Sequence, residues 1–138
     1  MRHLKTALAL IAVGSLAIGL SGCFFNPSSG FAVLDRPAEA RDALPAELPD
    51  SEDLIFDPES ARFVADDDGV PLYLASDGAS GICLLVYAAA SPVPHVGCGG
   101  GQRLGLKGPG FKYEVRADGM PAPDGATALS PNVYRIDD

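Results

Sequence analysis

The sequence predicts a small, mainly β domain: an antiparallel sheet, half-barrel or sandwich of five to six short strands, stapled by one disulfide bond. Short apolar or alternating runs recur after residue 58, and turns rich in Gly, Asp and Pro separate them. Residues 111–116 alternate apolar and charged side chains, which is typical of an antiparallel strand with one solvated face. Two cysteines, Cys83 and Cys98, lie in this region and are placed to join its strands.

Six runs are candidate strands. In chain order they are residues 61–65, 70–74, 81–87, 94–98, 111–116 and 133–136. The run 81–87 is apolar at every position after its glycine, which indicates a central strand buried on both faces. Residues 118–131 are rich in Pro and Gly, so an ordered loop is expected there.

Two runs between the strands invite a ligand-binding interpretation and fit better as connections. The run 66–69 is three aspartates and a glycine, but an EF-hand register would place Val64 and Ala75 where acidic ligands belong. An acidic hairpin turn is therefore predicted. The glycine-rich run 97–101 lacks the Gly-Lys-Ser/Thr sequence and the helix of a phosphate-binding loop. A flexible or tightly bent connection is expected there.

The start of the chain predicts a signal for export. Arg2 and Lys5 make a positive beginning, and residues 7–20 carry no charge. A positive start, a short apolar stretch and small residues before a cleavage point describe a secretory signal peptide. The alternative, a transmembrane helix, needs about 20 apolar residues. The uncharged run before Ser21 has 14 residues, interrupted by Ser15 and two glycines, and so is too short.

Leu20, Ser21, Gly22 and Cys23 resemble the lipobox of bacterial lipoproteins, in which an aliphatic and two small residues precede a cysteine. The resemblance implies a diacylglyceryl group on the Cys23 thiol and cleavage between Gly22 and Cys23. Two acyl chains hold a protein stably on a membrane, whereas one chain binds only marginally. We therefore expect Cys23 to anchor the protein to the cell membrane, on the extracytoplasmic face.

Three segments follow from this interpretation: a lipoprotein signal peptide over 1–22, a lipidated tether over 23–57 and a small β-rich domain over 58–138. The tether is acidic and rich in Pro and Ala, and high charge with few large apolar residues disfavours a packed core. Residues 37–44 are expected to form two helical turns. Four apolar residues are expected to dock onto the edge of the domain: Leu48, Leu54, Ile55 and Phe56.

The charge balance bears on the partners of the protein. The chain has 18 acidic and 10 basic residues, a formal net charge of −8. Cleavage before Cys23 removes Arg2 and Lys5 but no acid, which moves the balance to −10. A surface this acidic, with no basic patch expected to offset it, repels nucleic acid. We therefore expect no nucleic-acid partner.

With Cys23 assigned to the lipid, Cys83 and Cys98 remain as a pair. Two cysteines in an exported chain predict a disulfide bond. The alternative is a metal site that adds His95, three residues before Cys98. Structural zinc generally needs four protein ligands, including a second close pair that this sequence does not offer. No metal and no other cofactor is expected.

No catalytic constellation is complete in the sequence, and no catalytic residue is assigned. If His3 is removed with the signal peptide, His95 is the only histidine that remains as a general base. Gly78 and Ser80 match the first and third positions of the Gly-x-Ser-x-Gly nucleophile elbow, but Ile82 occupies its last position, where a glycine is required. Paired carboxylates for glycoside hydrolysis need a cleft. A domain of about 80 residues has little volume to form one.

The chain as a whole resembles small, uncharacterised lipoproteins exported by actinobacteria. The resemblance rests on the lipobox, the acidic stretch 36–50, the sequences Gly-Ile-Cys-Leu-Leu-Val and Val-Gly-Cys-Gly-Gly, and the closing Leu-Ser-Pro-Asn-Val-Tyr. It implies an address at the cell surface and transfers no active-site residue.

The leading functional hypothesis is a membrane-anchored, non-enzymatic module that binds or supports a partner at the cell envelope. Binding requires only a rigid sheet and its loops. One alternative is a small secreted hydrolase that uses His95 or a carboxylate pair. Another is an inhibitor or immunity-type protein whose acidic surface complements that of another secreted or envelope protein.

Overall fold

The structure, a computed structural model, describes residues 30–45, 53–88, 91 and 93–137. Its elements in chain order are α1 (Ala32–Asp35), η1 (Ala40–Asp42), η3 (Pro58–Ser60), β1 (Arg62–Asp67), β2 (Val70–Ser76), β3 (Gly81–Val86), β4 (His95–Gly100), β5 (Arg103–Gly108), β6 (Phe111–Arg116), β7 (Ala126–Ala128) and β8 (Val133–Ile136).

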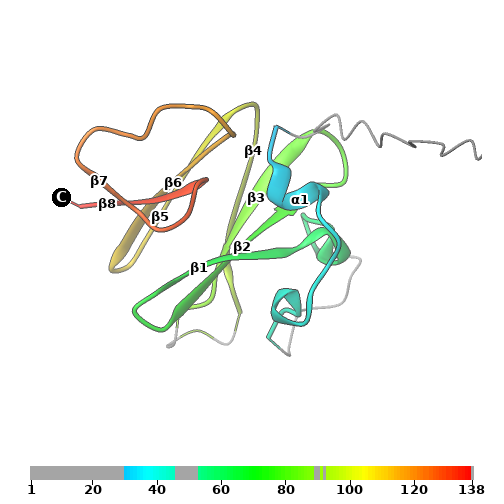
Figure 1. The fold of residues 1–138 in the computed structure, drawn as a ribbon. Coiled ribbons are helices and arrows are strands. Elements are labelled where there is room, and N and C mark those ends of the chain that lie inside the picture. The colour runs from blue at the N-terminus through cyan, green and yellow to red at the C-terminus, as the bar shows by residue number, and fades with distance from the viewer. Residues whose placement is uncertain (1–29, 46–52, 89–90, 92, 138) are drawn as a thin grey trace, which may run out of the picture.

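The strands form two antiparallel sheets of four strands each (Figure 1). Sheet A has the order β1-β2-β3-β4, and sheet B has the order β5-β6-β8-β7. The chain therefore completes one sheet before it starts the other, and the turn after β4 leads from sheet A into sheet B. The predicted fold class is confirmed: the described residues are mainly β, antiparallel and short-stranded. They contain eight strands rather than five or six.

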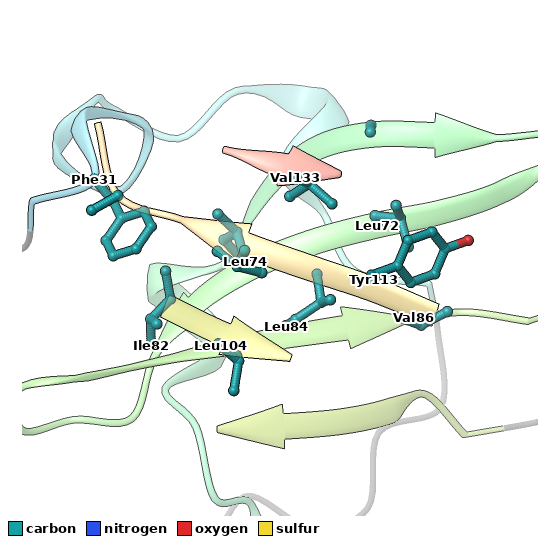
Figure 2. Packing of buried hydrophobic residues seen from close by; sticks show 12 residues of the cluster. Phe31, Leu72, Leu74, Ile82, Leu84, Val86, Leu104, Tyr113 and Val133 are labelled. Carbon is teal, nitrogen blue, oxygen red and sulfur yellow. The ribbon is translucent and has the colours of Figure 1, made fainter. Parts of the chain in front are cut away.

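The main hydrophobic core lies between the two sheets, which makes the domain a sandwich. Alternate residues of β2 and β3 meet those of β5, β6 and β8 there, as two packed sheets require. Figure 2 shows Phe31 at the end of this cluster near Ile82, and Tyr113 at the end near Val86. The buried members from the strands include Leu72, Leu74, Ile82, Leu84, Val86, Leu104, Tyr113, Val115 and Val133.

A second cluster covers the face of sheet A that points away from sheet B. Side chains before β1, among them Leu44, Leu54 and Phe56, pack there against Cys83 and Leu85. Strand β3 is thus buried on both faces, as its uninterrupted apolar sequence predicts. Of the four apolar residues expected to dock, Leu54 and Phe56 do so, Ile55 is 60% exposed, and Leu48 lies outside the described residues.

The glycine-rich run after Val96 is strand rather than a flexible connection, which corrects that expectation. Gly97, Gly99 and Gly100 belong to β4, and only Gly101 adopts a positive φ, of 91°. A Cβ atom on Gly97 would lie 2.8 Å from the Cδ1 of Leu106 in β5. The missing side chain lets sheet A approach sheet B closely at the point where the chain crosses between them.

Strands β5 and β7 are absent from the predicted set. Strand β5 reads Arg-Leu-Gly-Leu-Lys-Gly, and its two glycines hide the alternation that places Leu104 and Leu106 on the core side. Strand β7 has three residues inside the predicted loop 118–131, and it pairs only with β8. Both strands owe their position to pairing with β6 and β8, which a local sequence pattern cannot reveal.

The folded part of the chain begins earlier than the boundary at residue 58 drawn from the sequence. Phe31 is 1% exposed in the main core, and α1 contacts β1 and β2 at one end of sheet A (Figure 1). The backbone nitrogen of Ala32 donates to the Asp118 carboxylate over 2.6 Å, and that of Asp118 donates to the Gly30 carbonyl over 2.9 Å. Residues 30–45 therefore form part of the domain.

A buried ion pair fixes this N-terminal segment to sheet A. The Arg36 guanidinium donates two hydrogen bonds to Asp42, over 2.6 and 2.7 Å. Asp42 is 5% exposed, and its carboxylate also accepts from the backbone nitrogens of Glu39 and Phe63. The Nε of Arg62, in β1, donates to the Arg36 carbonyl over 3.1 Å. Both carboxylate oxygens of Asp42 thus accept hydrogen bonds, as a carboxylate must when it is buried away from water.

Replacement of Asp42 by Asn should lower the free energy of unfolding by about 3 kcal/mol, because it leaves the guanidinium of Arg36 without its buried partner. The hydrogen bonds from the Arg36 guanidinium and from the backbone nitrogens of Glu39 and Phe63 hold the pKa of the Asp42 carboxyl well below its usual range. This stabilisation is complete above pH about 4, the unfolded value, and is lost as the pH falls toward the folded value. Urea unfolding at several pH values measures both effects. Glu39→Gln, at a half-exposed acid, is the control, and equal losses in the two variants would contradict the prediction.

The disulfide bond between Cys83 and Cys98 is confirmed, and it joins directly paired positions of β3 and β4. It encloses a loop of 15 residues along the chain. Replacing both cysteines by alanine should therefore reduce the free energy of unfolding by about 3 kcal/mol in the chain-entropy model. Denaturant unfolding of the two forms measures the loss. Two free thiols in the unreduced, denatured wild-type protein would show that the bond does not form.

Candidate functional site

The residues predicted to carry the lipid lie outside the described part of the chain. These are Leu20, Ser21, Gly22 and Cys23. The two remaining cysteines form the disulfide bond between β3 and β4 of sheet A. The sulfur atoms of Cys83 and Cys98 both lie 3.8 Å from the Ile55 carbonyl oxygen, beneath the segment that covers sheet A.

His95 lies far from Ser80, the serine with the partial nucleophile-elbow sequence. It begins β4 and pairs with Val86, while Gly81 and Ile82, at the other end of β3, lie beside Ser80. Ile82 and Val86 are four residue steps apart along the strand, or about 13 Å. The His95 ring packs edge-on against Phe111, with 5.2 Å between ring centroids. The fold therefore holds the histidine in an aromatic contact, out of reach of the Ser80 hydroxyl.

Asp67 and Asp137 come together in the structure, and an arginine holds them. The Arg135 guanidinium donates to Asp67 over 2.5 Å and to Asp137 over 3.0 Å. Hydrogen bonds from Thr127 and Arg135 lower the pKa of Asp137, whereas a general acid needs a raised one. The Tyr113 hydroxyl also donates to Asp67, over 2.9 Å. Asp67 belongs to sheet A and its partners to sheet B, so this cluster ties the two sheets together.

The acidic turn 66–69 is a tight hairpin, as predicted. Asp68 and Gly69 adopt positive φ values of 51° and 87°, and the backbone nitrogen of Gly69 donates to the Asp66 carboxylate over 2.7 Å. Two positive φ values are characteristic of the turns that connect twisted antiparallel strands. Within the described residues, no group of three or more His, Cys, Asp or Glu side chains is placed to hold a metal ion.

Basic side chains gather on β5 and β6 of sheet B, although no basic patch is expected from the sequence. Arg103 pairs with Arg116, and Lys107 pairs with Lys112, across β5 and β6. Alternation along the strands places all four on the face of sheet B that points away from the core. Glu114 lies among them and binds Arg103 over 3.3 Å and Arg116 over 2.7 Å. The acid offsets part of this charge, and the arginines are engaged with it.

A cavity of about 300 Å³ lies at the end of the sandwich where α1 docks. It is bounded by α1, η3, the end of β2, the start of β3 and the connection between them. Phe31, Leu34 and Ile82 give it apolar walls, and Ser60, Ser76 and Ser80 line it with hydroxyl groups. Its volume lies at the lower end of the range of small-molecule sites, which is about 300–1,000 Å³.

Asp35 is the one charged residue among those that line this cavity. Its Oδ2 atom is buried and has no hydrogen-bond partner in the described structure. A buried carboxylate oxygen without a donor lowers the stability of the fold. Asp35 as a residue is only half-buried, and this oxygen atom is shielded from the cavity as well as from protein donors. Asp35 has no histidine and no second acid beside it among the residues that line the cavity.

Sequence reasoning missed Asp35 because the Pro-rich, acidic stretch around it was interpreted as a tether. The available signal was the apolar run Phe31-Ala32-Val33-Leu34, which precedes Asp35 directly. Phe31 and Leu34 are spaced as on one face of a helical turn.

No family model, curated protein or solved structure matches this chain. In the part of the chain that the structure describes, no helix has the length and apolar character needed to span a membrane.

Replacement of Asp67 by Asn should lower the pKa of Tyr113. Burial raises that pKa most, and the hydrogen bond and negative charge of Asp67 raise it further. In the wild-type protein a raised tyrosine pKa means that folding stability is complete below pH about 10 and decreases at higher pH. The variant should lose less stability on alkaline titration. Tyrosinate absorbance against pH measures the shift, with Asp137→Asn as the control, and identical curves for Asp67→Asn and wild type would refute the link.

Proposed function

We propose that this protein is a lipid-anchored module on the extracytoplasmic face of a bacterial cell membrane, and that it binds a ligand or partner without transforming it. The anchor is Cys23, modified after cleavage of residues 1–22. The observation that carries the proposal is the early start of the folded domain. Residues 24–29 separate Cys23 from Gly30, which is the first residue that the structure describes and which already belongs to the packed segment.

This short connection limits how far the domain can lie from the lipid. Seven residue steps from Cys23 to Gly30 span at most about 25 Å when fully extended. The longer tether expected from the sequence, over residues 23–57, would reach several times as far. A domain held this close acts at the membrane surface.

The disulfide bond supports an extracytoplasmic location. Such bonds persist in oxidising compartments and are rare in the cytosol, where thiols are kept reduced. Cys83 and Cys98 are joined within the main sheet, so the bond is part of the folded domain. An export signal and a structural disulfide bond are consistent with each other.

Binding is favoured over hydrolysis by the placement of the polar groups. His95 and the Ser80 hydroxyl lie at opposite ends of β3, and the acids that meet at Arg135 are held in ion pairs. The cavity beside α1, in contrast, combines apolar walls with a few convergent polar groups. That combination recognises a ligand but supplies no nucleophile activated by a base.

Replacement of Cys23 by Ser in the full chain, expressed in a bacterium, should abolish lipidation and leave residues 1–22 attached. Mass spectrometry of the purified protein measures both changes. The wild-type protein should lack residues 1–22 and carry a diacylglyceryl group on Cys23. The double variant Cys83→Ala/Cys98→Ala is the matched control, because it removes the other two cysteines and should keep the anchor. A wild-type mass without lipid would refute the proposal.

A further inference from the structure

Charge is distributed unequally between the two halves of the chain. Residues 23–102, which include all of sheet A, contain 13 acidic and three basic residues. Residues 103–138, which include all of sheet B, contain five acidic and five basic residues. The excess of negative charge therefore belongs entirely to the part of the chain that forms sheet A. Sheet B can present a surface of the opposite sign.

The outer side of the β5–β6 hairpin is such a surface. Four basic side chains and one acid point away from the core there, and we call this set the basic face: Arg103, Lys107, Lys112, Glu114 and Arg116. Lys107 is exposed, and the Arg103 side chain is 63% exposed. Because the one acid offsets one of four positive charges, the face keeps an excess of three.

The acidic half of the molecule does little to weaken the attraction of the basic face for an anionic surface that touches it. Two packed sheets lie about 10 Å apart, and salt at physiological concentration screens charges over about 8 Å. An anionic surface in contact with sheet B is therefore largely screened from the charges beyond sheet A. The chain is acidic as a whole and can still attract anions from this one side.

The connection to Cys23 begins at one end of the basic face. The backbone nitrogen of Asp118 donates to the Gly30 carbonyl over 2.9 Å, and a Cβ atom on Gly30 would lie 3.8 Å from that of Ala117. Ala117 directly follows Arg116, which pairs with Arg103 across the hairpin. The start of the folded segment and the end of β6 thus lie side by side (Figure 1).

The lengths of the connection and of the hairpin are compatible with contact between this face and the membrane. Lys107 lies four residue steps beyond Arg103 along β5, or about 13 Å. The extended connection from Cys23 to Gly30 spans at most about 25 Å. A lipid on Cys23 and both ends of the basic face can therefore reach one membrane surface at the same time.

We propose that the basic face lies against anionic phospholipid headgroups of the membrane that holds the Cys23 lipid, and that it orients the domain with sheet A away from the bilayer. This inference rests on the lipid anchor proposed above and adds a second contact with the same membrane. Each basic residue close to an anionic membrane strengthens binding about fivefold. The anchor keeps the domain at a high local concentration, at which such a weak attraction is sufficient.

The test uses the lipidated protein, purified after expression of the full chain in a bacterium and inserted into nanodiscs. These contain phosphatidylcholine alone or with an equal part of phosphatidylglycerol, and a nitroxide on some headgroups broadens the amide signals of nearby residues. In the anionic nanodiscs the Gly105 amide, on β5, should broaden more than the Phe56 amide, on the covered side of sheet A. This difference should disappear in neutral nanodiscs, and also at about 1 M salt, where the screening length is about 3 Å.

Replacement of Arg103 by Gln should reduce the population of this orientation about fivefold, the effect of one basic residue near an anionic membrane. Arg41→Gln is the matched control, because Arg41 lies in η1, which contacts β1 of sheet A. Its side chain is 59% exposed and pairs with Glu39, as that of Arg103 pairs with Glu114. The control variant should keep the wild-type orientation.

Equal broadening of the Gly105 and Phe56 amides in anionic nanodiscs, or equal effects of the two variants, would overturn the inference. So would a response of the Gly105 amide to polyglutamate without orientation on anionic nanodiscs, which would assign the basic face to an acidic protein. Association with neutral nanodiscs depends on the anchor alone. Its absence would refute the anchor and this inference together, whereas association without orientation would refute this inference only.

Discussion

Phe31 is buried between the two sheets, and its position determines the course of the chain on both sides. Fully burying such a side chain stabilises a fold by about 2–3 kcal/mol, while ordering each backbone residue opposes it by about 1–2 kcal/mol. One aromatic ring therefore cannot hold residues 30–42 alone. The ion pair between Arg36 and Asp42, and the hydrogen bonds of Asp118 with Gly30 and Ala32, supply the further attachment.

Docking of this segment creates the candidate site and sets its distance from the anchor. Without α1 against the sheets, the cavity would lose Phe31, Leu34 and Asp35, which are its main apolar walls and its only charge. The same contacts leave few residues between Cys23 and the domain. The cavity and the short connection to Cys23 thus both result from the docking of residues 30–42 on the sheets. Sheet A is stiffened by the disulfide bond and by burial on both faces, which gives the segment a rigid surface to dock on.

Much of the sandwich could be predicted from local patterns, and the site could not. Strand β3 and strand β6 were found because one is apolar throughout and the other alternates, signals that depend on the residues themselves. Strand β5 was missed because Gly105 and Gly108 replace polar residues of its alternating pattern. The glycines of β4 have a reason that exists only in the folded state, since Cβ atoms on Gly97 and Gly99 would crowd Leu106 and Leu104 of β5. The cavity beside Asp35 was missed because its walls come from residues that are distant in the chain.

Amide hydrogen exchange of the N-terminal segment in the full-length protein tests the central claim most directly. The amide of Leu34 donates to the Phe31 carbonyl, and that of Ala32 donates to Asp118. If residues 30–42 are docked, both amides should exchange at least about a hundredfold more slowly than in an unstructured peptide, an opening free energy of about 2.7 kcal/mol. Exchange of both at unstructured rates, while the amides of β3 remain protected, would contradict the account.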